Sequence, residues 1–400
     1  MKRILLALVT LAVLCCGSNQ PPTANAMPEP PKSTGYSAAP AEVAVGVIPA
    51  AVVHDAARNK DIEVALDYPA KGGPFPLIIF SHDFGGSDRS YEQLVAYWTT
   101  HGYVVARPSH ADAGAAQDAM RAIFAERPEE QKGDKKKSQK ETAKEMQERR
   151  AAAEMQAAAE VWTKSREPQW RDRVHDITLI IDSLDTLEQR YPELKGKISH
   201  DKIGVAGHSL GAFTAMLAGG VKTFSDPPLA LGDARVRSVI AMSPPGISAN
   251  RGLTAQSFAD VKIPVMFMTG TEDRGASEAE NANWRKSAFA SSPAGDKYFV
   301  LLEGARRSSF LGTYAPIDIP QTTSIPMPQT RDPRNPYTQP EMVQQPRGGP
   351  VNPQVGRQVF SNIRVLSLAF WDAYLKGETK GKELLTKNSE VLGGVKVETK

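Results

Sequence analysis

Short apolar runs recur along the chain at the spacing of strands in a layered domain. Seven runs stand out, and several are almost continuously apolar: residues 62–66, 77–80, 103–106, 203–206, 236–242, 265–269 and 298–302. A strand that is apolar throughout is covered on both faces, as the strands of a parallel sheet between helices are. We therefore predict seven strands of a mostly parallel sheet.

Two further stretches place apolar residues three or four positions apart, which is the period of a helix with one buried face. The two sets are Val174, Ile177, Ile181, Leu184 and Leu187, and Val359, Ile363, Leu366, Phe370 and Tyr374. Helices that alternate with strands in this way are typical of an α/β fold. We expect a mostly parallel central sheet with helices on both faces.

The N-terminus has the pattern of an export signal. Lys2 and Arg3 precede an apolar run at residues 4–14 that is too short to span a bilayer as a helix. We expect residues 1–26 to be a signal peptide and the protein to be periplasmic or extracellular. Leu14-Cys15-Cys16-Gly17 loosely resembles a lipoprotein signal, which would instead leave a lipid anchor. A chain cut after Ala26 keeps neither of its two cysteines, and so has no disulfide and no thiol chemistry.

Composition divides the rest of the chain. Residues 27–50 are rich in Pro, Ala and Ser and predict a flexible leader, residues 51–376 the main domain, and residues 377–400 a C-terminal tail. Within the domain, residues 112–168 form a charged helical insertion, which is either a lid over the ligand-binding rim of the sheet or a solvated excursion. Residues 315–353 hold ten of the 30 prolines and predict a surface loop.

The overall charge excludes one class of partner. With 48 basic and 45 acidic residues, the net charge of +3 gives no sustained positive field of the kind that phosphate backbones select. We therefore expect no nucleic-acid partner. Since no other segment is apolar for long enough, we also expect no membrane span.

The chemistry of the chain centres on Gly207-His208-Ser209-Leu210-Gly211. This Gly-x-Ser-x-Gly pattern follows a strand and precedes a helical run at residues 212–217, which is the context of a nucleophile elbow. The turn is so sharp that a Cβ atom at either glycine would meet the neighbouring strand or helix, and the serine itself is strained. We predict that Ser209 is a nucleophile rather than only a helix cap.

A nucleophilic serine needs an oxyanion hole and an acid that orients its base. The backbone N–H groups of Leu210 and of Phe84, in the glycine-containing turn at residues 81–86, are the predicted oxyanion donors. Asp273 follows the strand at 265–269, where the order serine, acid, histidine places the acid. Glu272 is the alternative acid, and an aspartate in a surface turn is the simpler interpretation.

The residues from about 53 to 310 resemble bacterial α/β-hydrolases similar to dienelactone hydrolase and platelet-activating-factor acetylhydrolase. The matching motifs, in one order along the chain, are Asp55-Ala56-Ala57-Arg58, Phe80-Ser81-His82 through Gly86, His101-Gly102-Tyr103, Trp170-Arg171-Asp172-Arg173, the elbow, Ser243-Pro244-Pro245-Gly246 and Thr269-Gly270-Thr271-Glu272-Asp273. The resemblance implies hydrolysis of a small ester through an acyl-serine intermediate, without a metal or organic cofactor.

Two residues depart from that family pattern. Relatives usually carry glycine where this chain has Asp83, and they carry the triad histidine where this chain has Arg307, in Gly304-Ala305-Arg306-Arg307-Ser308-Ser309-Phe310. None of the seven histidines follows Ser209. Arginine stays protonated and cannot accept the serine proton. A carboxylate at Asp83 would repel the developing oxyanion, and we hypothesise that Arg307 pairs with it.

Other histidines offer alternatives. His82 and His110 both follow strands and lie close to Asp83 and Asp112 in the sequence, so they could supply a rewired base or bind a divalent metal. Two hypotheses for function result. The first is an exported serine esterase with an acyl-Ser209 intermediate and impaired turnover. The second is a pseudohydrolase, a binding or scaffold protein that keeps the pocket for a small ester or ligand.

Overall fold

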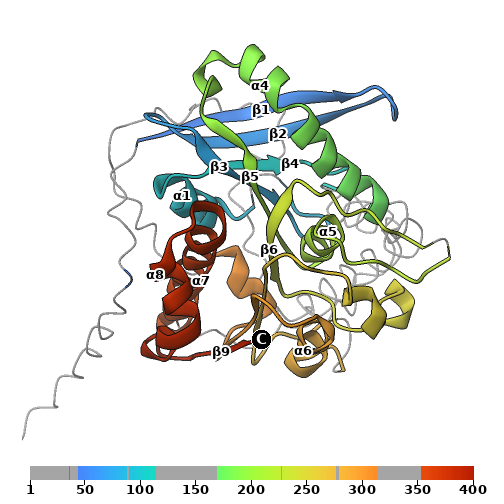
Figure 1. Cartoon of the computed structure of the whole chain (residues 1–400), viewed down its shortest axis with the longest axis vertical. Coiled ribbons are helices and arrows are strands. Elements are labelled where there is room, and N and C mark those ends of the chain that lie inside the picture. The colour runs from blue at the N-terminus through green and yellow to red at the C-terminus, as the bar shows by residue number, and fades with distance from the viewer. Residues whose placement is uncertain are drawn as a thin grey trace, which may run out of the picture.

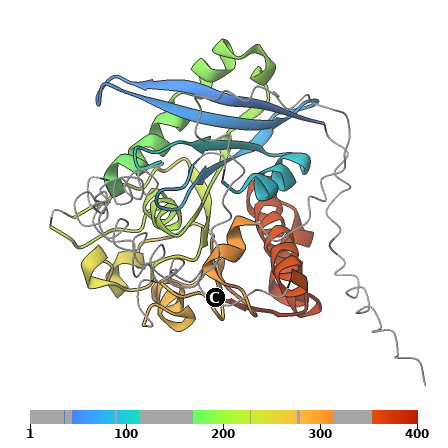
Figure 2. The ribbon, with the colours of Figure 1, turned by 180° about the vertical axis from the view of Figure 1, so that it is seen from behind.

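A single nine-stranded sheet organises the molecule, in the order β1-β2-β4-β3-β5-β6-β7-β8-β9. The computed structural model describes residues 36, 44–87, 90–113, 169–226, 228–275, 279–312 and 353–400. The sheet twists through the centre with helices on both sides (Figures 1 and 2). Strands β3 to β8 are joined in parallel, whereas β1–β2, β2–β4 and β8–β9 are antiparallel. The predicted α/β-hydrolase fold is confirmed.

The nine strands include all seven predicted from the apolar runs. Their bounds are β1 Val45–Asp55, β2 Lys60–Pro69, β3 Phe75–Ser81, β4 Val104–Pro108, β5 Ile198–His208, β6 Val236–Met242, β7 Val265–Gly270, β8 Lys297–Leu302 and β9 Val395–Thr399. Every residue of β4 and β7 is buried. This burial on both faces explains why the sequence of these strands is not alternating.

Helices cover the two faces of the sheet. They are α1 Glu92–Thr100, a helical stretch at 169–182, α4 Leu184–Arg190, α5 Leu210–Ala218, α6 Ala282–Ser291, α7 Pro353–Trp371 and α8 Thr379–Glu383. The predicted faces are the ones that pack: Val174, Ile177 and Ile181 lie in one core cluster, and Val359, Ile363 and Leu366 in the other. The cluster with Val174 also contains residues of α5 and α6, and the cluster with Val359 contains residues of α1 and α7.

The sheet extends beyond both predicted boundaries of the domain. β1 begins at Val45, inside the predicted leader at 27–50, and β9 lies in the predicted tail at 377–400. Pro49 falls where the β1–β2 register shifts, between Ile48 and Ala51, and proline is tolerated in edge strands at such irregularities. The domain boundaries are corrected accordingly, because both edge strands carry hydrogen bonds of the sheet.

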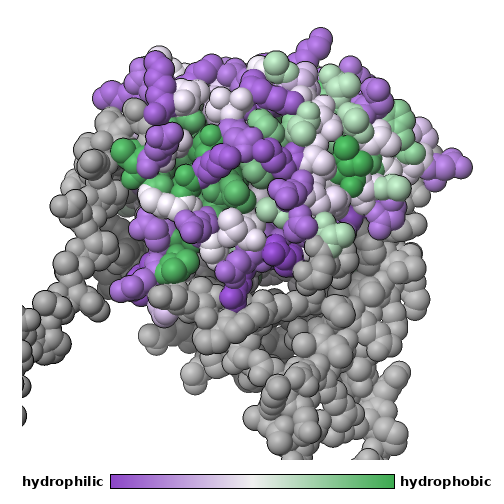
Figure 3. All heavy atoms as spheres, turned by 90° about the horizontal axis from the view of Figure 1, so that it is seen from below, coloured by the Kyte–Doolittle hydropathy of each residue, from purple (hydrophilic) through white to green (hydrophobic). Residues whose placement is uncertain are grey.

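Several predicted segments lie outside the described residues. The signal peptide at 1–26 is among them, as are the insertion at 112–168 apart from its first two residues and the loop at 315–353 apart from Pro353, which begins α7. No helix in the described ranges is long and apolar enough to cross a membrane. On the face shown in Figure 3, hydrophilic and hydrophobic residues are interspersed over the described part.

The turn from β5 into α5 leaves no room for a side chain at its glycines. A Cβ atom at Gly211 would lie 1.9 Å from the Ser81 carbonyl oxygen, and one at Gly207 would lie 2.2 Å from the Gly211 carbonyl oxygen. Both neighbours are main-chain atoms, so neither can rotate away. The end of β3 and the start of α5 therefore touch through Gly211, which brings the loop after β3 against Ser209.

We predict that Gly211→Ala lowers the free energy of unfolding by about 3 kcal/mol or more, because the backbone must shift to accept the methyl group. Gly393→Ala is the matched control, since a Cβ atom there meets nothing within 4 Å, and we expect it to change stability by less than about 0.5 kcal/mol. Urea unfolding measures both. Equal effects of the two substitutions would contradict the close contact at Gly211.

Candidate active site

Ser209 lies at the sharpest point of the β5–α5 turn. Its backbone has φ 57° and ψ −110°, and its N–H donates to the Met242 carbonyl oxygen at 2.8 Å. Positive φ at a residue with a side chain costs about 1–3 kcal/mol and is concentrated at functional sites. Leu210 begins α5 directly after it. Ser209 therefore has a strained backbone conformation directly before α5, as the sequence predicts for this turn.

The hydroxyl of Ser209 contacts an arginine, not a histidine. Arg307 is the first residue of a 3₁₀ turn, Arg307–Leu311, that follows β8. Its Nη2 donates to Ser209 Oγ and to both carboxylate oxygens of Asp83, at 3.0 Å and 3.1 Å. The hypothesised ion pair between Asp83 and Arg307 is present. A cation thus occupies the position from which a base would take the serine proton.

The carboxylate of Asp83 accepts a hydrogen bond from one of the two predicted oxyanion donors. The N–H of Phe84 donates to Asp83 Oδ1 at 2.6 Å, and the Ser209 side chain also hydrogen-bonds to the carboxylate. Burial alone would raise the pKa of Asp83, but the charge of Arg307 and these hydrogen bonds hold it well below its usual range. Asp83 is therefore ionised at neutral pH, and its charge lies where an ester would develop its own.

Asp273, the predicted triad acid, already has a buried arginine as its charge partner. It is fully buried at the end of β7 and accepts hydrogen bonds from Ser243 Oγ at 3.0 Å, Thr269 Oγ1 at 2.9 Å and Arg285 Nη2 at 3.0 Å. The acid of a triad orients a base and stabilises its charge. Here the charge of Asp273 is compensated by buried Arg285, a partner that sequence reasoning missed.

The alternative acid, Glu272, points away from the site. Its side chain is half exposed and pairs with Arg306 Nε at 2.8 Å. Of these two neighbouring acids, Asp273 is the one that the fold buries. Its role in catalysis stays a prediction.

His208 faces the core next to the elbow. Its Nδ1 lies 2.7 Å from the Tyr91 hydroxyl, and its ring packs against Tyr91 and Phe310. Burial lowers the pKa of His208 to about 4. The ring is therefore neutral at pH 7 and packs structurally.

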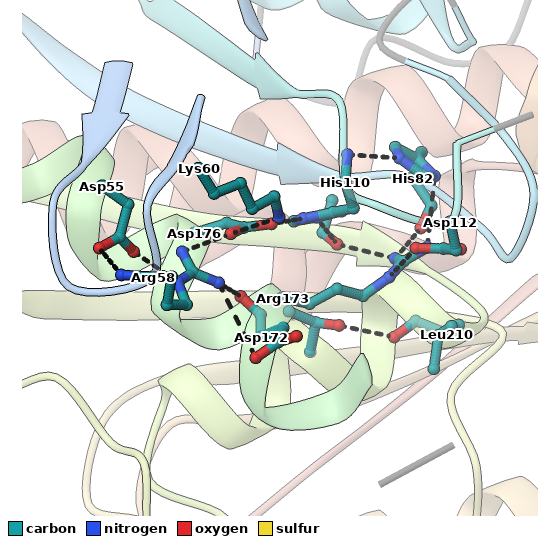
Figure 4. A network of polar contacts seen from close by, with 12 residues as sticks. Asp55, Arg58, Lys60, His82, His110, Asp112, Asp172, Arg173, Asp176 and Leu210 are labelled. Atoms are coloured by element: carbon teal, nitrogen blue, oxygen red, sulfur yellow. Dashed lines mark hydrogen bonds and ion pairs between the residues drawn. The ribbon is translucent and has the colours of Figure 1, made fainter. Parts of the chain in front are cut away.

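A buried polar network that includes Arg173, Asp112 and His82 holds the loop at residues 81–86 (Figure 4). Arg173, on the helical stretch at 169–182, donates to both oxygens of Asp112 at 2.9 Å and 2.6 Å, and to the carbonyl oxygens of His82 at 2.6 Å and Asp83 at 3.3 Å. Asp112 in turn accepts the N–H of Gly85 at 3.2 Å. The main chain of the loop is thus fixed independently of the side chain of Asp83.

The same network contains a Ser-His-Asp chain of its own. Ser81 Oγ lies 2.9 Å from His110 Nε2, and His110 Nδ1 lies 2.8 Å from Asp176 Oδ2. The arrangement has the order of a triad, but Ser81 and Asp176 are 0% exposed and His110 is 2% exposed. Because no substrate reaches a fully buried hydroxyl, we interpret this chain as structural support. Asp176 is further neutralised by Arg58 at 2.7 Å and Lys60 at 3.4 Å.

The hydrogen bonds of His82 and His110 bear on the two alternative roles considered for them, a rewired base and a metal site. The N–H of His110 donates to His82 Nε2 at 3.2 Å, so the His82 proton is on Nδ1, 2.6 Å from the Asp83 carbonyl oxygen. Both rings therefore hydrogen-bond within the network and not to Ser209. In the part of the chain that the structure describes, no three His, Cys, Asp or Glu residues are arranged to hold a metal ion.

The sequence contained one signal for this network. Arg173 and Asp176 lie on the helical stretch that carries the apolar face of Val174 and Ile177, and both are buried. Charged residues are rarely fully buried unless they are paired. Charged positions beside an apolar helical face are therefore the feature that could have identified them.

The buried histidines predict acid sensitivity. Burial, together with the charge of Arg173, lowers the pKa of His82 to about 3, and burial lowers that of His208 to about 4. Between those values and the unfolded value of about 6.5, the unfolded chain binds more protons, so stability is complete above pH 6.5 and falls as the pH falls. We expect the free energy of unfolding to drop by about 1.4 kcal/mol per pH unit for each histidine in this window.

Urea unfolding at pH 7, 6, 5 and 4 measures this slope. His82→Asn, which keeps a donor near the Nδ1 position, should reduce it. His54→Asn is the matched control, because the His54 side chain is 57% exposed, and it should leave the slope unchanged. A stability that stays constant down to pH 4 would contradict the neutral, buried state of both rings.

Comparisons with known proteins agree with this architecture. A family model described as "Platelet-activating factor acetylhydrolase, isoform II" matches residues 41–269, more than half of the chain. That range contains Asp83 and Ser209 and ends before Asp273 and Arg307. The platelet-activating factor acetylhydrolase of Cavia porcellus is 28% identical over 178 residues, which are 43% of this chain and 36% of that protein. The chain thus matches little more than a third of the length of that relative.

A solved structure provides a likeness of fold. A ferulic acid esterase from Streptomyces cinnamoneus superposes with a TM-score of 0.54 at 16% identity, covering 90% of this chain and 97% of that one. The family match, the sheet order and the elbow agree with one another, and the resemblance noted in the sequence is confirmed. The chain belongs to the platelet-activating factor acetylhydrolase isoform II family and has the α/β-hydrolase fold.

Proposed function

We propose that this protein is a carboxylic-ester hydrolase that acts through an acyl-Ser209 intermediate with low turnover. The observation that carries the proposal is Ser209 itself, held at φ 57° between β5 and α5. The relatives named above are an acetylhydrolase and an esterase, and the bond they share is a carboxylic ester. We take a small ester as the substrate class.

We propose the following roles for the residues of the site. Ser209 Oγ attacks the ester carbonyl carbon and gives up its proton to solvent water, and the C–O bond to the alcohol breaks as the leaving oxygen takes a proton from water. A second water molecule later releases the acid from the acyl-serine. The N–H groups of Leu210 and Phe84 would stabilise the oxyanion. Asp273 takes the position of the triad acid, and Arg307 takes the position of the base.

Turnover is low because the base is absent. The guanidinium of Arg307 donates to Ser209 Oγ, and it cannot accept a proton in return. Loss of a triad member leaves roughly 10³–10⁴-fold catalysis over water from the oxyanion hole and binding. We also propose, from the N-terminal sequence, that the protein is exported to the periplasm or beyond, with a lipid anchor as the alternative route.

A second function is favoured by a specific observation. Because Asp83 occupies the Phe84 N–H and Arg307 blocks the base position, the site also suits a pseudohydrolase, a binding or scaffold protein that does not turn over. The two functions differ in whether Ser209 reacts.

Hydrolysis of p-nitrophenyl acetate separates them. We expect wild type to exceed Ser209→Ala, and we expect Arg307→His to gain up to about 10²-fold, the lower range of general-base catalysis, because Asp273 is shared with Arg285. Arg306→His is the matched control, since Arg306 is adjacent but pairs with Glu272, and it should gain nothing.

Labelling by a fluorophosphonate gives an independent readout. Mass spectrometry should find the label on Ser209 in the wild type and should find none on Ser81 in the Ser209→Ala variant, because Ser81 is buried. If wild type hydrolyses no faster than Ser209→Ala and Ser209 stays unlabelled, the hydrolase proposal is wrong and the pseudohydrolase stands.

A further inference from the structure

The carboxylate of Asp83 makes contacts that a bound carboxylic acid would make in an ester-hydrolase site. Its Oδ1 accepts the Phe84 N–H at 2.6 Å, and both oxygens contact Arg307 Nη2, at 3.0 Å and 3.1 Å. The hydroxyl of Ser209 hydrogen-bonds to the carboxylate of Asp83 and also contacts Arg307. A backbone donor, a guanidinium and a hydroxyl thus converge on one carboxylate.

While this carboxylate is in place, an ester carbonyl oxygen cannot bind to the predicted oxyanion donor at Phe84. The predicted oxyanion donor at Phe84 has one N–H, and Asp83 Oδ1 accepts it. A second oxygen that gains negative charge next to an ionised carboxylate is repelled. A substrate can use this donor only when the side chain of Asp83 has left it.

The Phe84 N–H does not depend on the side chain of Asp83 for its placement. Arg173 donates to the carbonyl oxygens of His82 and Asp83, the second of which shares a peptide group with the Phe84 N–H, and Asp112 accepts the N–H of Gly85. The side chain of Asp83 can therefore be removed while the Phe84 N–H keeps its direction. The vacated space is reachable from solvent, because the side chains of Asp83 and Arg307 are 24% and 40% exposed.

We propose that the Ser209 site is a binding site for small carboxylates, which Asp83 of the same chain fills as an internal ligand, so that the protein is self-inhibited. The inference rests on the proposed function in one respect only, that Ser209 and Phe84 mark the place of the ester carbonyl. The binding itself requires no turnover. Removing the side chain of Asp83 opens the site to acetate or formate.

Chemical rescue tests the proposal. Thermal unfolding of Asp83→Gly is measured against sodium acetate and sodium formate, with sodium chloride at the same ionic strength. We expect Asp83→Gly to be less stable than wild type and to recover with a saturable rise in Tm of about 2–3 °C at tenfold excess over Kd. Wild type should show no such rise, because Asp83 already fills the site.

Two further variants make the test specific. Asp83→Gly combined with Arg307→Gln should lose saturable rescue or need at least about tenfold more acetate, since the charge-assisted contact is gone. Glu272→Gly is the matched control: it also removes the carboxylate partner of an arginine, Arg306, but outside the Ser209 site, and acetate should not stabilise it.

The outcomes decide the proposal. A folded Asp83→Gly that acetate stabilises no more than chloride does, or no more than it stabilises Glu272→Gly, overturns it. If Asp83→Gly does not fold, Asp83→Ser takes its place in the same titration. Rescue by acetate without ester hydrolysis in any variant would uphold the carboxylate site and reject the proposed hydrolase. Hydrolysis without rescue would do the reverse.

Discussion

The ion pair between Asp83 and Arg307 sets the charges next to Ser209, and the other features of the site depend on it. Either residue alone would leave a partly buried charge next to Ser209 without a partner, which is costly. Together they neutralise each other across two loops, one after β3 and one after β8. The two residues predicted to depart from the family pattern are therefore partners in one salt bridge.

Paired charges recur wherever this part of the fold buries an acid. Asp112 pairs with Arg173, Asp273 with Arg285 and Asp176 with Arg58, each with a carboxylate at most 4% exposed. Since a buried carboxylate stays ionised only when it is paired or hydrogen-bonded, these arginines fix the charge state of the site. The pair at Asp273 bears on catalysis, because a histidine placed at position 307 would meet an acid whose charge is already shared.

Local patterns predicted the parts of the fold that depend on local physics. The seven apolar runs became strands because burial on both faces requires apolar residues, and the elbow formed where only glycine fits. β1 was missed because Pro49 interrupts it in an Ala-rich segment. β9, whose Val395 and Val397 alternate with charged residues, was missed because it lies in a polar tail. Both are edge strands, whose sequence is constrained by one neighbour instead of two. The partners of Arg173 lie 61 to 92 residues away in the sequence, and Ser243 lies 30 residues from Asp273, so no local pattern could identify these contacts.

The retention of Ser209 is explained by more than its chemistry. A glycine would relieve the strain at φ 57°, yet the serine hydroxyl is the group that both Arg307 and Asp83 contact. It contributes to the ion pair as well as being a potential nucleophile. The reactivity of Ser209 therefore depends on whether its contact with Asp83 or its contact with Arg307 is lost first. A base at position 307 would still face a carboxylate on the oxyanion donor, whereas removal of that carboxylate leaves Arg307 free to stabilise negative charge on an incoming carbonyl. In the proposed scheme, displacement of Asp83 is accordingly the step that admits a substrate, and a base would only accelerate the attack of Ser209 on a substrate already admitted.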